Sequence, residues 1–117
     1  MYSPQLIDHF EHPRNVGELP DATATAQIEN PACGDVLKLS VKIVDGRIVE
    51  ARFRAKGCVP AIACGSALTE LVVGRTPAEA EKITRGEVAA AVGGVPQAST
   101  HAGQLAVDGL RAALKKL

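Results

Sequence analysis

Two segments with alternating apolar and polar side chains, joined by a tight turn, constrain the fold of this chain more than any other feature. A period of two is the pattern of a strand that has one buried and one solvated face. The pair Asp45-Gly46 between the segments suits a hairpin turn. The sequence therefore predicts an antiparallel hairpin with one wet face. Its apolar positions are Leu37, Leu39, Val41 and Ile43 in the first strand, and Val49, Ala51, Phe53 and Ala55 in the second.

The segment before the hairpin predicts one helix and one strand. Ser3 followed by Pro4 is a helix-start signal, because serine can cap the first free N–H groups and proline has none to lose. We expect a helix over residues 4–11 and a weak strand over residues 23–29. The inner stripe of the helix is expected to hold Leu6, Ile7 and Phe10.

The segment after the hairpin predicts helices. One is expected over residues 60–73, between a proline that suits a first helical turn and a glycine that suits a left-handed cap. A capping box at Thr76 and Glu79 begins a broken helical stretch. Ser99 or Thr100 caps a last helix. Its apolar stripe is Leu105, Leu110, Ala113, Leu114 and Leu117. The order of elements predicts an α+β fold, a small antiparallel three-stranded sheet with helices packed on one face.

Length and composition predict one soluble domain over residues 1–117. Thirteen basic and thirteen acidic side chains cancel without forming a basic run, which argues against nucleic-acid binding. No apolar run approaches the roughly 20 residues that span a bilayer, and the first residues carry no export signal. We therefore expect a cytoplasmic protein that does not enter a membrane.

Four side chains at predicted element boundaries can bind a metal. Three cysteines is an odd number in a chain without an export signal, which favours thiolate or metal chemistry over disulfides. Cys33 and Asp35 precede the second strand and Cys58 follows the third, so the antiparallel hairpin brings them together. His101 begins the last helix. Thiolates and imidazole suit zinc, iron and iron-sulfur clusters, and a carboxylate adds a harder, more labile ligand. The spacing matches no compact zinc-finger pattern.

Several segments resemble the signatures of iron-sulfur cluster assembly scaffolds of the IscU/NifU N-terminal type. They are Tyr2-Ser3 through His9-Phe10, His12-Pro13-Arg14-Asn15-Val16-Gly17, Pro31-Ala32-Cys33-Gly34-Asp35-Val36, and Lys56-Gly57-Cys58 with Ala61-Ile62-Ala63. The resemblance implies a non-enzymatic scaffold that receives sulfur from a cysteine desulfurase, assembles a [2Fe-2S] cluster and passes it to apo iron-sulfur proteins. The ligands that it implies are Cys33, Asp35, Cys58 and His101, a set that would also hold zinc.

The chain departs from the family pattern at the start of the last helix. The resemblance places a third cysteine, a cluster ligand and persulfide acceptor, where this chain has Ala102, and a lysine where it has Ser99. That lysine belongs to a motif read by a DnaK-type chaperone, and Val95-Pro96-Gln97 keeps only part of the motif. This argues against chaperone delivery. The loss also opens an alternative, a degenerate paralogue that binds zinc or iron and regulates a cysteine desulfurase without building clusters.

The candidate site residues also have simpler interpretations, and Cys33 and Cys58 could be inert loop cysteines. Asp35 could shape its loop, and a lone histidine such as His101 is commonly a surface residue. Cys64 could replace the absent third ligand, but it lies on the inner stripe of its helix, and core packing is the favoured interpretation. His9 and His12 are expected at the surface, since isolated histidines usually are.

Overall fold

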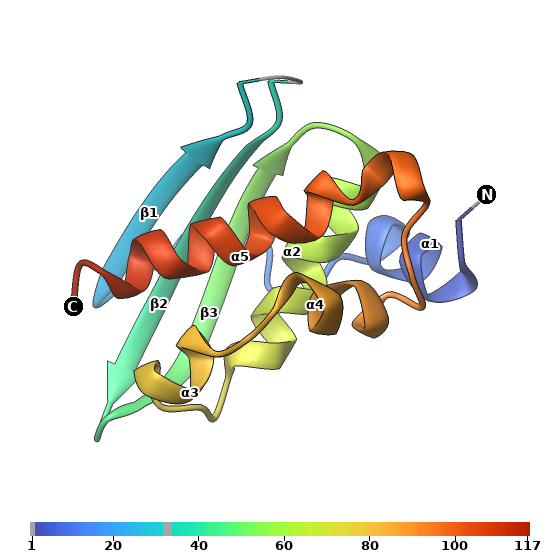
Figure 1. Ribbon diagram of the computed structural model, residues 1–117. Coiled ribbons are helices and arrows are strands. Elements are labelled where there is room, and N and C mark those ends of the chain that lie inside the picture. Colours follow the sequence, from blue (N-terminus) through green and yellow to red (C-terminus); the bar gives the residue numbers. More distant parts are fainter. Residues whose placement is uncertain (1, 32–33) are drawn as a thin grey trace.

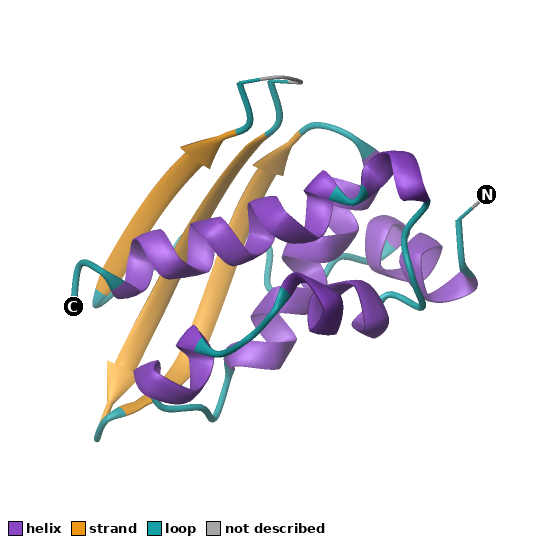
Figure 2. Ribbon diagram, in the orientation of Figure 1, coloured by secondary structure: helices purple, strands orange, loops and turns teal. Residues whose placement is uncertain are grey.

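The structure is a computed structural model that describes residues 2–31 and 34–117. Its elements, in chain order, are α1 (Pro4–Glu11), β1 (Ala24–Glu29), β2 (Val36–Val44), β3 (Arg47–Lys56), α2 (Val59–Val72), α3 (Pro77–Glu81), α4 (Arg85–Ala91), a 3-10 turn (Gln97–Ser99) and α5 (His101–Leu114). The strands form one antiparallel sheet in the order β1-β2-β3, and α2 and α5 lie across one face of it (Figures 1 and 2). The predicted α+β architecture is confirmed.

The hairpin has the turn that its sequence predicts. Asp45 and Gly46 both have positive φ, at 52° and 76°, as the favoured two-residue hairpin turns require. Leu39 faces Phe53 across the pair of strands, and both side chains are buried. The apolar side chains of β2 and β3 that form the floor of the core are Leu37, Leu39, Val41, Ile48, Ala51 and Phe53.

The expected alternation of β3 is wrong at Val49, which is 47% exposed, whereas Ile48 is fully buried. The register between β2 and β3 shifts at this point, because Lys42 pairs with Glu50 while Ile43 pairs with Ile48. One extra residue on β3 therefore sits in a bulge. Side chains change face across such a bulge, so the period of two, followed back from Phe53, assigns the first residues of β3 to the wrong side.

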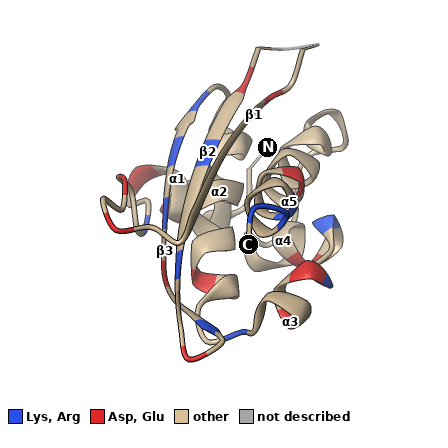
Figure 3. Ribbon diagram, turned by 90° about the vertical axis from the view of Figure 1, so that its left-hand side faces the viewer, with Lys and Arg blue, Asp and Glu red and all other residues tan. Residues whose placement is uncertain are grey.

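The outer face of the sheet is less solvated than the alternation predicts. Asn15 and Gly17 exchange backbone hydrogen bonds with Phe53 at the outer edge of β3. The chain then follows the outer face, where basic residues recur along β2 and β3 (Figure 3), and Asp21 pairs with Lys42 at 2.6 Å. Ser40, expected on the wet face, is buried and accepts a hydrogen bond from the Thr25 hydroxyl at 3.1 Å.

Two glycines let the covering helices approach the sheet closely. A Cβ atom at Gly65 of α2 would lie 2.8 Å from the Phe53 ring, and one at Gly109 of α5 would lie 2.7 Å from Leu37. Real Cβ atoms essentially never come so close. The core contains few aromatic side chains, so it depends on this close packing of small residues.

The prediction for α1 is confirmed in its bounds but wrong in its inner face. Ser3 caps the helix by accepting the Leu6 N–H, and Leu6 is buried as expected. Ile7 and Phe10 are 41% and 37% exposed. The other buried residue of the helix is His9, which was expected at the surface.

A polar contact with α2 explains the buried histidine. His9 Nδ1 shares a 2.8 Å hydrogen bond with the Ser66 hydroxyl, which also accepts the backbone N–H of Arg14. His9 Nε2 lies 3.6 Å from the Glu70 carboxylate. Partners from a distant helix therefore satisfy the ring. His12 is exposed, as expected. Among the helices of the described residues, none is long and apolar enough to cross a membrane.

Candidate metal centre

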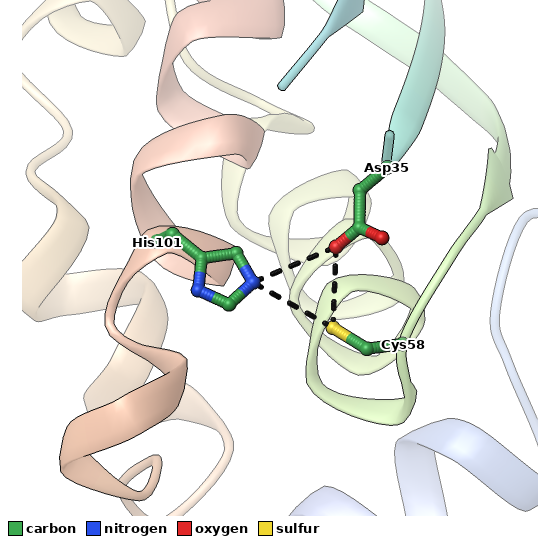
Figure 4. A group of neighbouring side chains, drawn as sticks. All are labelled: Asp35, Cys58 and His101. Atoms are coloured by element: carbon green, nitrogen blue, oxygen red, sulfur yellow. Dashed lines mark hydrogen bonds and ion pairs between the residues drawn. The ribbon is translucent and has the colours of Figure 1, made fainter. Parts of the chain in front are cut away.

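Asp35, Cys58 and His101 meet at one end of the sheet (Figure 4). The Cys58 thiol donates to Asp35 Oδ2 at 3.2 Å, and its Sγ lies 3.8 Å from His101 Nε2. The third side of the triangle, from His101 Nε2 to Asp35 Oδ2, measures 3.5 Å. One donor atom from each residue thus lies within 4.8 Å of the others, close enough for all three to bind one ion. Cys33, the fourth expected ligand, lies outside the described residues.

The hairpin places two of these residues side by side. Val36 begins β2 and pairs with Lys56, the last residue of β3. Asp35 directly precedes β2, and Cys58 follows β3 with only Gly57 between, so the antiparallel register sets them next to each other. This is the juxtaposition that the sequence predicts for Asp35 and Cys58.

The Asp35 carboxylate is held in a tight space. Backbone hydrogen bonds from Asn30 to the Asp35 carbonyl and from Gly34 to the Asn30 carbonyl, of 2.8 and 2.7 Å, close the loop before β2. Asp35 is only 5% exposed, and it packs against Gly57, whose φ is +153°. A Cβ atom at Gly57 would overlap Oδ1 and lie 2.5 Å from Cγ of Asp35. Position 57 therefore needs glycine both for its backbone conformation and for the carboxylate beside it.

Cys58 is the N-cap residue of α2, in an extended conformation with φ −73° and ψ 163°. Its side chain makes no capping hydrogen bond to the helix and points instead toward Asp35 and His101 (Figure 4). The helix end carries partial positive charge, which stabilises a thiolate at this position. The side chain is partly exposed, so the sulfur is accessible from solvent.

His101 is the first residue of α5, after the 3-10 turn and Thr100. Its side chain is 34% exposed and forms the rim of the centre. The next residue, Ala102, is 1% exposed, because one step along a helix turns the side chain from the rim into the core. Alanine has no donor atom, so position 102 adds none to the centre.

Cys64 lies inside α2, one of the most buried residues of the core. Burial, and to a smaller extent the charge of Cys58, raises the pKa of its thiol to about 12. A thiol with that pKa stays protonated at neutral pH and is a weak metal ligand. These observations agree with the packing interpretation of Cys64.

The steric role of Gly57 is the feature that sequence reasoning misses. A glycine beside a cysteine lets the backbone approach a bulky cofactor, but in the structure the atoms nearest to a Cβ built at position 57 belong to Asp35. A glycine directly before a ligand cysteine is a signal of close approach. It does not say which group approaches.

The sheet, its two covering helices and the cluster of sulfur, oxygen and nitrogen donors define a small α+β domain with a candidate centre for a soft or borderline metal. The sequence profile described as NifU-like N terminal domain matches residues 1–117. The chain belongs to this family.

Named relatives are similar over nearly the whole chain. Iron-sulfur cluster assembly scaffold protein IscU 1 of Archaeoglobus fulgidus is 46% identical over 114 residues, which are 97% of this chain and 74% of the relative. The scaffold protein IscU of Azotobacter vinelandii is 42% identical over 119 residues, 97% of this chain and 91% of the relative. A crystal structure of a candidate SUF-system scaffold from Fervidobacterium islandicum superposes with a TM-score of 0.82 at 20% identity, covering 97% of this chain and 96% of the other. That likeness shows a shared fold.

Proposed function

We propose that this protein is a scaffold on which iron-sulfur clusters, of the [2Fe-2S] type, are assembled and from which they pass to apo-proteins. The observation that carries the proposal is the convergence of Asp35, Cys58 and His101 within 4.8 Å from three separate segments of the chain. Cys33, two residues before Asp35 in the sequence, is the fourth proposed ligand. The names of the relatives, which are called cluster assembly scaffolds, support the same function.

The donor set suits a cargo that has to leave. Thiolates bind iron strongly, while a carboxylate is a harder ligand that exchanges more readily. The Asp35 side chain is 7% exposed and that of His101 is 34% exposed, so the centre has a buried side and an open rim. We propose that clusters form from the rim side and leave by it. Zinc would fit the same four side chains as a tetrahedral site and would compete with iron for them.

The proposed partners are a cysteine desulfurase, which supplies sulfur, and apo iron-sulfur proteins, which take the finished cluster. The protein itself would catalyse no turnover. We place it in the cytoplasm, because reduced thiols persist in a reducing compartment. The alternative, a metal-binding regulator of a desulfurase, is not favoured, since the relatives are named as scaffolds.

Anaerobic reconstitution tests the proposal. Apo-protein is incubated with ferrous iron, cysteine and a cysteine desulfurase, and the absorption spectrum and acid-labile sulfide are measured. We expect sulfur-to-iron charge-transfer bands in the wild type and loss of these bands in Cys58→Ala and His101→Ala. Cys64→Ala is the matched control, because its thiol is buried outside the centre, and it should keep the bands. A change in desulfurase turnover without labile sulfide would instead identify a regulator.

A further inference from the structure

A groove of about 430 Å³ opens beside the metal centre and shares His101 with it. One wall is the end of β1, and the other is the first two turns of α5, the helix that crosses the covered face of the sheet (Figure 1) and contacts this strand. Arg85, the first residue of α4, closes the groove next to Thr100. The volume is in the range of small-molecule sites.

The groove presents charges of both signs. Arg85 offers a guanidinium, and Glu29 and Asp108 offer carboxylates. Within the described part of the chain, no ion pair joins Arg85 or Glu29 to another residue, and Asp108 accepts a 2.7 Å hydrogen bond from the neutral Gln104 amide. These groups therefore remain available to a ligand that carries both an anionic and a cationic group. A guanidinium pairs well with a carboxylate, and carboxylates pair with an ammonium group.

The position of His101 indicates which metal-binding atom the ligand carries. This residue lines the groove and also faces Cys58 and Asp35, so the groove and the metal centre share one side chain. Sulfur is the ligand atom that iron and zinc in such a centre bind well. Ile28 and Leu105 provide an apolar wall against which a thioalkyl group can pack.

We propose that the groove binds a low-molecular-weight thiol that carries both a carboxylate and an ammonium group, either a thiol amino acid or a short thiol peptide. Its sulfur lies at the His101 end and adds an exchangeable ligand to a metal held at the centre. On binding the metal the thiol forms a metal-sulfur bond and releases its proton to solvent, with no change of oxidation state. The inference rests on the proposed function, because it gives the scaffold a small-molecule ligand at the same site.

The first test uses apo-protein and two thiol probes, free cysteine and glutathione, followed by NMR titration of ¹⁵N-labelled protein. We expect saturable shifts at Gln104 and Leu105, with the tighter probe identifying an amino acid or a peptide as the source. Arg85→Ala should weaken binding about fivefold, the order expected for one exposed charge pair. Arg111→Ala is the matched control, an exposed arginine on α5 that lies outside the groove, and should bind as the wild type. Equal affinities in the two variants, or no shifts in the groove, would overturn the proposal.

The second test uses cobalt-substituted protein and follows the sulfur. Cysteine should add intensity to the sulfur-to-cobalt charge-transfer band, whereas serine, which carries the same two charges, should not. If serine and cysteine give the same spectrum, the sulfur does not reach the metal and the proposal fails. Thiol binding in apo-protein does not depend on cluster assembly. Failed reconstitution with intact thiol binding would therefore refute the proposed function alone, and normal reconstitution without thiol binding would refute only this inference.

Discussion

Replacing Gly57 with alanine should disable the metal centre through a single methyl group. The new Cβ would overlap Oδ1 of Asp35 and lie 2.5 Å from its Cγ, so the carboxylate has to leave its present position against Cys58 and His101 or the backbone has to shift. A φ of +153° is also strained for alanine, at about 1–3 kcal/mol. We expect Gly57→Ala to lower the free energy of unfolding by about 2–4 kcal/mol, from that strain together with about 1 kcal/mol of overpacking. Affinity for zinc should fall about 10–100-fold, as it does when the support of a metal ligand is lost.

Two measurements separate the effect of displacing the Asp35 carboxylate from the effect of backbone strain. Unfolding in urea gives the stability of each variant, and competition with a chromophoric chelator gives its zinc affinity. Gly46→Ala is the matched control, because Gly46 also has positive φ, at +76°, but a Cβ there meets nothing within 4 Å. This variant should lose stability through strain and keep its zinc affinity.

A double-mutant cycle with Asp35→Ala decides whether the contact is the cause. With the carboxylate removed, Gly57→Ala should cost only its backbone strain, so the two substitutions should couple by about 1 kcal/mol or more in stability. Additivity within about 0.5 kcal/mol, together with an unchanged zinc affinity in Gly57→Ala, would refute the reasoning.

Three further predictions concern the rest of the molecule. Burial, followed by the charge of Arg14, lowers the pKa of His9 below its ordinary value of 6.5. The folded protein therefore favours neutral His9, and the free energy of unfolding should fall as the pH drops below 6.5. His9→Gln should flatten this pH dependence in urea unfolding, and His12→Gln should not. In folded apo-protein, alkylation mapped by mass spectrometry should leave Cys64 unmodified, because burial raises the pKa of its thiol to about 12, and rapid modification would contradict its packing role. Gly65→Ala should lower the free energy of unfolding by about 1–3 kcal/mol, because the new methyl group overpacks against the sheet. Gly86→Ala should be neutral or stabilising, because a Cβ there would lie 3.7 Å from the nearest atom, Thr84 Oγ1. Equal effects of the two substitutions would refute the close-packing argument.

The sequence predicts the elements well because their signals are local. The turn at Asp45-Gly46, the proline in the first turn of α2 and the capping box at Thr76 each act within a few residues, and each is observed where expected. The errors arise where contact with a distant element determines which side chains are buried. Val49 changes face because of a register shift relative to β2, which no property of β3 alone reveals. His9 is buried because a serine 57 residues away accommodates its ring.

The candidate site also combines residues placed by local signals with a residue placed by a distant element. Asp35 and Cys58 are neighbours through one hairpin, so the sequence alone brings them together. His101 reaches these two residues only because α5 packs across the sheet in one particular position. Local turn and capping signals do not define that position. The presence of His101 at the site was expected from ligand chemistry and from the resemblance to the family. The groove beside His101 was not expected, because its walls come from β1, α4 and α5, which are far apart in the sequence.

This dependence on distant elements has a consequence for the behaviour of the scaffold. Two of the described donors belong to the hairpin and the following helix, while the third is carried by α5. The position of α5 depends on close contacts such as Gly109 against Leu37 and Gly103 against the backbone of Arg85. A metal that binds all three donors therefore stabilises the docking of α5, and any loosening of α5 weakens the hold on the metal by the same free energy. Release of a metal bound by all three donors and undocking of α5 would thus be linked in this fold.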